Sequence, residues 1–536
     1  MSLISPNDNK TFDRSNCVKT LEKSEKILFH YGEGFMYEPV PAGTRVIYPP
    51  PSIESIQDVD AAIEYAIENP LGCDPLSAQL KPGMKVTIAF DDLSVPLPSM
   101  RAPDIRQRII EKVLQKLADA RVSDIHLIAA LGLHRRMTPA ELKHALGKNI
   151  FNAFYPDKLY NHDAEDKDNI AFLGKTEKHE VVEVNRRAVE SDLLIYVNIN
   201  IASQSGGHKA IATGLGTYQT LKHHHNVHTL MHSRSYMDPQ NSALHRSCNR
   251  MGKIIESHMN IFRIETTTDN TSLPQTFGFL LKPSWDYNAL DQINLYANKL
   301  TTDILPTNLK REIFNRMRAP YGITGIHAGR TELVHEKTLE NVYRQHVVPV
   351  QGQADILISG VPYLGPYSVN SIMNPVLFMC QTLGYFFNFY RGKPLVRKGG
   401  VYILLYPLHE DFHPIHHPSY IEFYERVLTE TTDPKTIEEK YEEEFAYNPK
   451  YIDLFRNSYA FHGVHAFYAW YWGCHGLSQV GKVIVVKPRS KRPAEIMGFE
   501  TADSLAEAIE RAKDFVGLNP SITTYQAPPY LLCDVS

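Results

Sequence analysis

Short apolar segments alternate with helical segments along the chain, and this order predicts an α/β protein. Residues 85–90 (KVTIAF) and 124–131 (DIHLIAAL) have the continuous apolar character of buried strands. Between them, residues 105–120 repeat apolar side chains at helical spacing, as at Ile109 and Val113. Strand, helix and strand in this order form the parallel crossover unit of α/β folds.

The pattern continues through the second half of the chain. Residues 193–199 (LLIYVNI) predict another strand of the first sheet. After the helix-like segment NLKREIFNRMR, further strands are predicted at 354–360, 401–407 and 482–486. We therefore expect two α/β domains with mainly parallel sheets and the active site in the cleft between them.

Turn and cap signals divide the chain. The first 40 residues predict an irregular lead-in, and a proline cluster precedes the first helix. The last helix is expected to begin at a Thr501 or Asp503 cap and to end at Gly517. The acidic segment DPKTIEEKYEEEF predicts a solvated helix. The expected parts are a lead-in at 1–40, an N-terminal domain at 41–300, a C-terminal α/β domain at 301–490, and a helix and tail at 491–536 that pack back on the N-terminal domain.

Composition narrows the classes of function. A chain of 536 residues exceeds one hydrophobic core, and 43% hydrophobic with 22% charged residues is typical of a soluble globular protein. The net charge of −4 comes from interspersed charges, which disfavours nucleic acid or a membrane as partner. Without a secretory signal or a run of about 20 apolar residues, a cytoplasmic location is expected. The six cysteines form no CxxC motif and are expected to be reduced.

Two polar clusters follow predicted strands, where ligands of α/β sheets bind. After residue 90 come Asp91, Asp92 and Ser94 on a proline-bounded turn, where short acceptors could hold hydroxyl groups. After residue 131 comes His134, with Arg135 and Arg136 beside it, an imidazole that can exchange protons next to anion-binding guanidinium groups. The competing interpretation of His134 is structural, because an imidazole at a strand end readily satisfies loop carbonyls.

A third cluster, QSGGHKAIATGLGTYQTLKHHH at 204–225, combines a lysine with imidazoles. The glycines before Lys209 allow close backbone approach, and amides at such a turn can cradle phosphate, although no Walker loop is present. The alternative is a tight turn with a surface lysine. His224, His228 and His232 are spaced by four, as metal ligands on a helix would be, or as a solvated helix face. The cluster suggests a tethered cofactor with a metal.

A second metal motif is discounted. His409 and His413 match HExxH, the zinc protease signature, which requires a helix. Pro407 and Pro414 bracket the motif and make a helix unfavourable. This histidine-rich segment is better interpreted as a polar loop over the domain cleft, which His462, His465 and His475 could also face.

Five motifs in order resemble one family. DDLSVPLP, GLHRRMTPAELKHALG, NHDAEDKD, SGGHK and GLGTYQTLKHHH resemble the nickel-pincer nucleotide-dependent lactate racemase family. The similarity runs from about residue 80 to residue 230, with weaker echoes in the SGVP turn and in the strands at 401–407 and 482–486. The resemblance implies that the N-terminal domain is catalytic and holds the cofactor.

The resemblance also implies roles for single residues. The family's cofactor is a pyridinium mononucleotide that carries nickel and is joined to a lysine through a thioamide, here Lys209. His225 corresponds to the nickel ligand, and His134 corresponds to the base that takes the substrate hydroxyl proton. The loading of this cofactor would require cofactor-synthesis enzymes as partners. Further cofactor contacts are expected at Asp92, Ser94, Ser205, Gly206, Gly207 and Gly214.

The motif positions that would contact the substrate differ from those of the family. The second base is replaced by Ile199, and the arginine that would hold the substrate carboxylate is replaced by Val95. Compensating substrate contacts are expected among Asp91, Arg135, Arg136, His208, His413 and His465. Arg101 could also hold a carboxylate.

These departures favour a racemase or epimerase of a 2-hydroxy acid larger than lactate, such as a sugar acid, that works by reversible hydride transfer. The open alternatives are a one-base redox isomerase or dehydrogenase of a polyol or sugar, and a non-catalytic nucleotide or phosphate binder. The oligomeric state is left open.

Overall fold

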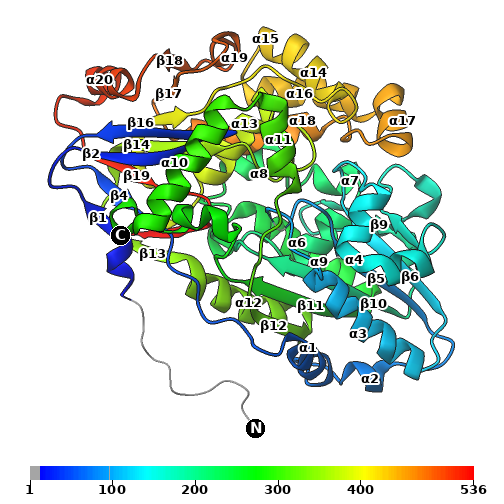
Figure 1. Cartoon of the computed structure of the whole chain (residues 1–536). Helices are drawn as coiled ribbons and strands as arrows, with labels where there is room; N and C mark the ends of the chain where they lie inside the picture. The colour runs from blue at the N-terminus through cyan, green and yellow to red at the C-terminus, as the bar shows by residue number, and fades with distance from the viewer. Residues whose placement is uncertain (1–12, 96) are drawn as a thin grey trace.

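The computed structural model of the chain describes residues 13–95 and 97–536, and it shows two sheets with helices around and between them (Figure 1). The first sheet has the order β12-β11-β10-β5-β6-β7 and is parallel except for the β11–β12 pair. Its strands are β5 (Lys85–Asp91), β6 (Asp124–Ala130), β7 (Leu159–Asn161), β10 (Leu193–Asn200), β11 (Ile261–Thr268) and β12 (Ile323–Gly329).

Helices cover both faces of the first sheet. Alternate residues of β10 enter different cores, because neighbouring side chains of a strand point to opposite faces. Leu193 and Ile195 pack in the core that contains α3, whereas Leu194 and Tyr196 pack in the core that contains α6 and α9. The helices concerned are α3 (Ile105–Asp119), α6 (Gly207–Gly214) and α9 (Ala243–His258).

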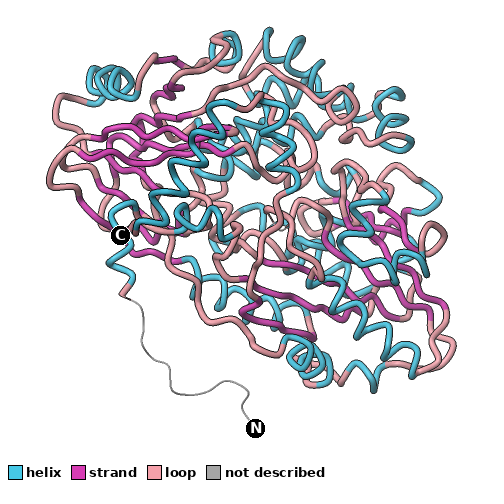
Figure 2. Tube along the Cα trace, viewed as in Figure 1, coloured by secondary structure: helices cyan, strands magenta, loops and turns pink. Residues whose placement is uncertain are grey.

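The second sheet gathers strands from distant parts of the chain, as their different colours in Figure 1 show, and Figure 2 shows its strands in magenta. Its order is β1-β4-β19-β14-β16-β17-β18, and β2 joins it beside β14 and pairs with β3. The central pairs are parallel. Its strands are β1 (Val18–Thr20), β2 (Glu25–Gly32), β3 (Gly34–Val40), β4 (Arg45–Ile47), β14 (Ala354–Pro362), β16 (Val396–Leu405), β17 (Lys482–Val486), β18 (Glu500–Ala502) and β19 (Ile522–Tyr525).

The two α/β units confirm the predicted fold class, but several boundaries were wrong. Residues 18–40 form strands rather than an irregular lead-in, because alternate apolar residues such as Ile27 and Phe29 pack in the core of the second sheet. The first unit extends past residue 300, through β12 and helix α12 (Thr331–His346), which packs on β11 and β12.

The end of the chain joins the second sheet, not the N-terminal domain. Helix α20 (Leu505–Val516) packs on β16, β17 and β18, and β19 is a member of that sheet. The N-cap of α20 is Ser504, whose side chain accepts from the Glu507 amide, and the helix ends at Gly517 as predicted.

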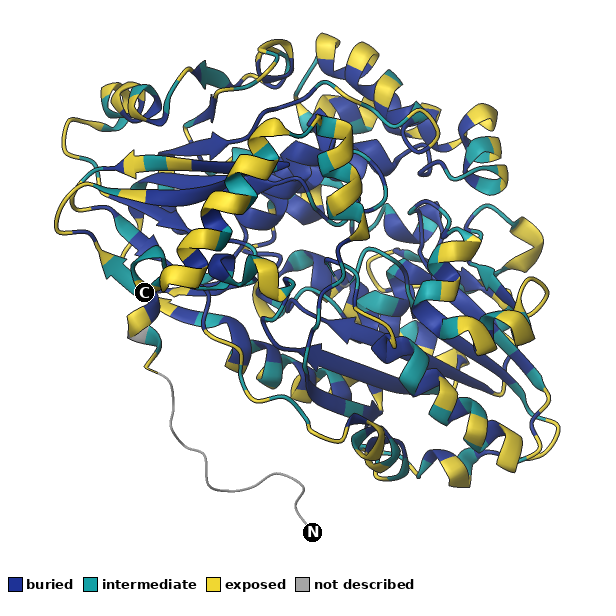
Figure 3. Ribbon diagram, in the orientation of Figure 1, coloured by how far each residue is buried: buried dark blue, intermediate teal, exposed yellow. Residues whose placement is uncertain are grey.

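One helix between the two units is almost entirely buried. Helix α18 (His465–Leu477) contacts α8 (Val227–Met231), α16 (Pro434–Ala446) and the π-helical segment η6 (Cys380–Phe386). Figure 3 shows the interior between the sheets as buried. Among the described residues, no helix has the length and apolar character needed to cross a membrane.

Candidate active site between the two domains

His134 follows β6 and is oriented by a carboxylate that follows β5. Its Nδ1 lies 2.8 Å from Asp92 Oδ2. Burial acts to raise the pKa of Asp92, but His134 and the hydrogen bonds from Ser94 hold it below its ordinary value. When Nδ1–H donates to this carboxylate, Nε2 is left to accept a proton. The site thus contains an oriented base.

Asp92 and Ser94 were predicted to bind the cofactor, but here they bind each other. Asp92 Oδ1 accepts from the Ser94 amide at 2.9 Å and from the Ser94 hydroxyl at 2.5 Å. Both carboxylate oxygens are therefore engaged within the chain, one by Ser94 and one by His134. The sequence did not predict that Asp92 orients His134, because the two residues meet only when β5 and β6 pair.

Asp91 holds the backbone rather than facing a substrate. Its carboxylate accepts from Asn198 Nδ2 and from the Ile199 amide, each at 2.7 Å. Burial raises its pKa to about 7. Ile199 is fully buried, so the position of the missing second base is filled by a side chain that cannot exchange protons.

The Ser-Gly-Gly turn joins β10 to the lysine helix α6 in a conformation that requires glycine. Gly206 has φ +83° and Gly207 has φ +57°, both in the left-handed region. A Cβ on Gly206 would lie 2.4 Å from Asn200 Oδ1. The Gly207 amide donates to Glu265 Oε1 at 2.7 Å, so this amide is not free for phosphate as predicted.

Gly214 also has a packing role instead of the predicted cofactor contact. Its carbonyl accepts from the Gly132 amide at 2.9 Å, which ties the end of α6 to the loop that carries His134. A Cβ on Gly214 would lie 2.7 Å from the Tyr196 hydroxyl oxygen. The two glycines thus fix the distance between the lysine helix and the histidine loop.

Lys209 and the histidines converge on His225. Burial lowers the pKa of Lys209, and it lowers the pKa of His225 well below its ordinary value. Four nearby groups lower the pKa of His225 further by their positive charge: His224, Lys209, His134 and His465. The residues that the resemblance assigns to tether, nickel ligand and base therefore interact electrostatically within one partly buried region.

Two aromatic rings that the sequence interpretation did not single out flank His225. The ring centroids of Tyr468 and Trp472 lie 5.3 and 5.6 Å from that of His225. His465, Tyr468 and Trp472 come from one face of α18, at helical spacings of three and four. The sequence feature that could have indicated this face is the run HAFYAWYW, in which His, Tyr or Trp recurs every third or fourth residue.

The predicted helix face of His224, His228 and His232 does not form. Helix α8 begins at Val227, after His224, whose Nε2 lies 3.1 Å from Thr213 Oγ1. In the part of the chain that the structure describes, no three His, Cys, Asp or Glu side chains are grouped as a metal site. The HExxH segment is not helical, as its prolines predicted, and His409 Nε2 lies 3.2 Å from Glu33 Oε2.

The residues around the Ser-Gly-Gly turn fit a bound polar cofactor. Asn200 is 1% exposed, yet both its amide nitrogen and its amide oxygen lack a partner among the described residues. Gln204 Oε1 and His225 Nδ1 are likewise buried without a partner. Buried polar atoms are usually hydrogen-bonded, so these orphans around Lys209 are consistent with a group that would satisfy them.

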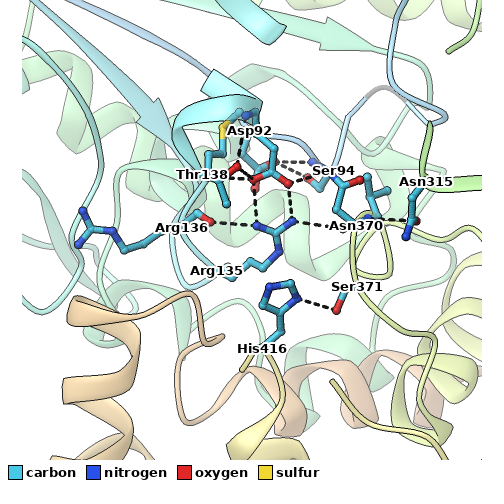
Figure 4. A network of polar contacts seen from close by, with 12 residues as sticks. Asp92, Ser94, Arg135, Arg136, Thr138, Asn315, Asn370, Ser371 and His416 are labelled. Carbon is cyan, nitrogen blue, oxygen red and sulfur yellow. Dashed lines mark hydrogen bonds and ion pairs between the residues drawn. The ribbon is translucent and has the colours of Figure 1, made fainter. Parts of the chain in front are cut away.

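Arg135 is not available to a substrate carboxylate (Figure 4). Its guanidinium donates to both oxygens of Glu141, at 2.7 and 3.1 Å, and to the carbonyls of Arg136 and Val369. Arg136 in turn donates to the Arg456 carbonyl. The expectation that either arginine holds the substrate is therefore not supported by these contacts.

The three histidines among the expected substrate contacts have different surroundings. His208 lies against α9, with Nδ1 3.2 Å from Asn249 Oδ1 and Nε2 3.4 Å from Glu256 Oε2, so it faces away from the candidate site. The His413 ring stacks on His416 at 3.7 Å. Of the three, His465 contacts His134, with ring centroids 5.2 Å apart.

His465 has its own partner. Its Nδ1 lies 2.5 Å from the Tyr420 hydroxyl, and burial lowers its pKa well below the ordinary value. His462 and His475 do not share this environment, because His462 Nε2 lies 2.9 Å from Glu165 Oε1 and His475 packs beside Tyr236.

Comparison with known proteins agrees with the motifs. The family profile of the lactate racemase N-terminal domain matches residues 31–238. Lactate racemase of Lactiplantibacillus plantarum is 28% identical over 168 residues, which is 31% of this chain and 38% of that protein. Lactate racemase of Thermoanaerobacterium thermosaccharolyticum is 26% identical over 167 residues, 30% of this chain and 37% of that protein. The matched region thus spans less than two fifths of these relatives.

The likeness of the folds extends further. The lactate racemase apoprotein from Thermoanaerobacterium thermosaccharolyticum aligns over 95% of this chain and 99% of its own, with a TM-score of 0.62 and 18% identity. A protein from Thermotoga maritima aligns over 90% of this chain and 100% of its own, with a TM-score of 0.51 and 15% identity. The resemblance predicted from the motifs is confirmed for residues 31–238, which are similar to the lactate racemase N-terminal domain, and the fold is similar to that of a lactate racemase apoprotein.

Proposed function

We propose that the chain is a racemase or epimerase of a 2-hydroxy acid that works with a nickel-pincer nucleotide held on Lys209. The observation that supports this proposal is the convergence of Lys209, His134 and His225 on one partly buried region, beside buried polar atoms without partners among the described residues. Lys209 would be the covalent tether and His225 the protein ligand to nickel. When bound, the cofactor would supply a reversible acceptor for the hydride of the substrate carbon.

The residues of the chain would move the hydroxyl proton. His134 Nε2 accepts the proton from the substrate hydroxyl, while Asp92 holds the ring through Nδ1 and stabilises the imidazolium that forms. The same atom returns the proton when the hydroxy acid is regenerated. Tyr468 and Trp472 flank His225 and help to keep water from the reacting centre.

A one-base reaction remains the second candidate, and one observation favours it. The edge-to-face contact of His134 with His465, at 5.2 Å between centroids, leaves no room for a substrate atom between the rings. These two imidazoles therefore do not bracket a substrate from opposite faces, and Ile199 cannot supply the second base. A redox isomerase or dehydrogenase of a polyol or sugar needs only His134. A mere nucleotide or phosphate binder would not need the His134–Asp92 pair.

The tether is tested by mass spectrometry. We expect protein produced together with the cofactor-synthesis enzymes to carry the adduct on Lys209 and to contain nickel. Lys209→Ala should lose both, whereas Lys222→Ala, a nearby lysine on the same segment, should keep both. An unmodified Lys209 in protein that inverts a hydroxy acid would contradict the proposal.

The reaction class is tested with substrates that carry deuterium on the reacting carbon. We propose that the substrate is larger than lactate, for example a sugar acid, because Val95 replaces the expected arginine. A screen of hydroxy acids and sugar acids should show inversion with the deuterium retained, because a transferred hydride does not exchange with water. Accumulation of a keto product without inversion would favour the dehydrogenase instead.

A further inference from the structure

A polar cleft adjoins the hollow at His134. The hollow and the cleft share Leu93 and Arg135 as lining residues. Figure 4 shows the Arg135 network at this boundary, with His416 on one side. The charged and imidazole side chains that line the cleft are Arg106, Arg135, Arg318, Glu141, His144, His413 and His416.

The cleft has one positive charge without a counter-ion. Arg106 is paired with Asp104 at 2.8 Å, and Arg135 is paired with Glu141 at 2.7 Å. Arg318 has no carboxylate partner among the described residues. Its Nη1 donates to the carbonyls of Asn315 and Met317, at 2.9 and 2.8 Å, and its Nε and Nη2 bind no described residue.

The backbone places Arg318 firmly beside the segment that follows Asp92. The Ala319 amide donates to the Ser99 carbonyl, and the Arg101 amide donates to the Ala319 carbonyl, each at 2.9 Å. Ser99 and Leu93 line the same cleft. Arg318 is therefore held on the wall of a cleft that begins at the His134 hollow.

The uncharged groups of the cleft can bind hydroxyls. His413 Nδ1 accepts from the backbone amides of Ile415 and His416, at 3.3 and 3.1 Å, so the proton of the neutral ring is on Nε2, a donor. His144 Nε2 lies 2.9 Å from the Met100 carbonyl and donates to it, which leaves Nδ1 as an acceptor. A polyhydroxy chain could therefore exchange hydrogen bonds along this wall.

We propose that Arg318 binds a second anionic group at the far end of the substrate, so that the substrate is a hydroxy diacid such as an aldaric acid. This inference rests on the proposed function, because it places the reacting carbon at His134. Arg135 is already paired and position 95 is a valine, so Arg318 is the guanidinium of this region that remains available. Its planar fork suits a carboxylate.

An apolar cavity offers the competing place for the distal end. It shares Pro366 with the His134 hollow and is lined by residues such as Phe35, Leu280 and Phe386, with no Lys, Arg, Asp or Glu among its described lining residues. That cavity would favour an alkyl chain over a charged group. Ligands that match in length but differ in charge therefore show which of the two sites binds the distal end of the substrate.

The test is calorimetric binding of two matched pairs to the full-length protein. Glucarate differs from gluconate, and 2-hydroxyadipate from 2-hydroxyhexanoate, only in the distal carboxylate. We expect Arg318→Gln to weaken the diacids about tenfold or more, as loss of a charge-assisted hydrogen bond would, and to leave the monoacids within about twofold. The control Arg316→Gln, in which an exposed pair with Glu312 is lost, should change neither.

Several outcomes would overturn the proposal. One is that Arg318→Gln weakens the binding of diacids and monoacids equally, and another is that it weakens the binding of neither. A third is that 2-hydroxyhexanoate binds more tightly than 2-hydroxyadipate, which would assign the distal end of the substrate to the apolar cavity. Arg318→Lys keeps the positive charge but not the planar guanidinium, so it should weaken diacid binding less than Arg318→Gln. If Arg318→Gln does not fold, the diacid and monoacid affinities of Arg318→Lys test the proposal instead. Binding is measured with and without the loaded cofactor. If no adduct forms on Lys209, the proposed function is refuted, and this result is independent of whether the protein binds diacids.

Discussion

At the scale of single residues, the side chain that determines what His134 can do is Asp92. The carboxylate fixes the ring through Nδ1 and is itself fixed by Ser94. A bare histidine at a strand end could be structural or catalytic, and the sequence left both interpretations open. The carboxylate behind the ring favours the catalytic interpretation, because a base that must carry a transient positive charge gains from a buried negative partner.

Replacing Asp92 by Asn tests this pairing. An amide cannot stabilise the imidazolium and can stabilise the wrong tautomer of His134, so we expect kcat to fall by about 10² or more, with little change in KM. The measurement is the rate of inversion of the substrate found in the screen. Ser94→Ala is the matched control, because it removes a partner of Asp92 but keeps the contact with His134. Near-normal turnover in Asp92→Asn would show that another group is the base.

At the residue scale, the sequence indicates groups of side chains within one segment, but it does not show contacts between distant segments. Lys209 and His225 lie within one segment, and in the structure His225 interacts electrostatically with both Lys209 and His134. Arg135 is paired with Glu141, six residues later, and only its further contact with the Val369 carbonyl joins distant parts of the chain. Arg318 was not predicted, because its place in the cleft depends on a bridge between residues 100 and 319.

At the scale of elements, the Ser-Gly-Gly turn controls where the lysine helix begins. Both glycines have positive φ, and Asn200 and Glu265 lie where a Cβ on Gly206 would be. The sequence predicted the turn and the close approach, but it assigned that approach to phosphate. The structure shows that side chains of the protein itself crowd the turn, which gives the glycines a structural role.

Gly206→Ala should therefore destabilise the fold. The left-handed backbone alone costs about 1–2 kcal/mol for a residue with a Cβ, and crowding against Asn200 Oδ1 at 2.4 Å adds on the order of 1 kcal/mol or more. Gly498→Ala is the control, because Gly498 has φ +72° but no atom within 4 Å of its Cβ position. Urea unfolding of both variants should show the larger loss in Gly206→Ala. Equal losses would mean that the neighbours of Gly206 move aside without cost.

At the scale of the whole molecule, the two units are joined by segments that are far apart in sequence. The short strands β4 and β19 pair in parallel, with Val46 opposite Thr524, and so bring the beginning and the end of the chain into one sheet. The predicted boundaries failed here because such strands are too short to show a clear period. Core strands such as β5 and β16 were predicted because their apolar runs are long and continuous.

The contact between the units also involves an acid that was expected to be solvated. Glu442 of α16 is 5% exposed, and it accepts from the Tyr218 hydroxyl of the first unit at 3.2 Å and from the Tyr471 hydroxyl of α18 at 3.0 Å. Other acids of this helix, such as Glu443, are exposed as predicted. Burial raises the pKa of Glu442 to about 7.

This raised pKa makes the stability of the molecule depend on pH. Between about pH 4.5, where the unfolded glutamate loses its proton, and about pH 7, where the folded one does, the folded state binds more protons. Its contribution to the free energy of unfolding therefore falls as pH rises through this window.

Glu442→Gln keeps the hydrogen-bonding shape without the charge. Its free energy of unfolding should match that of the parent protein near pH 5 and exceed it near pH 8, by on the order of a few kcal/mol. Glu443→Gln, on the exposed side, should change neither value. Urea unfolding at both pH values measures the effect, and a Glu442→Gln variant that is less stable at pH 8 would show that the ionised carboxylate holds the two units together.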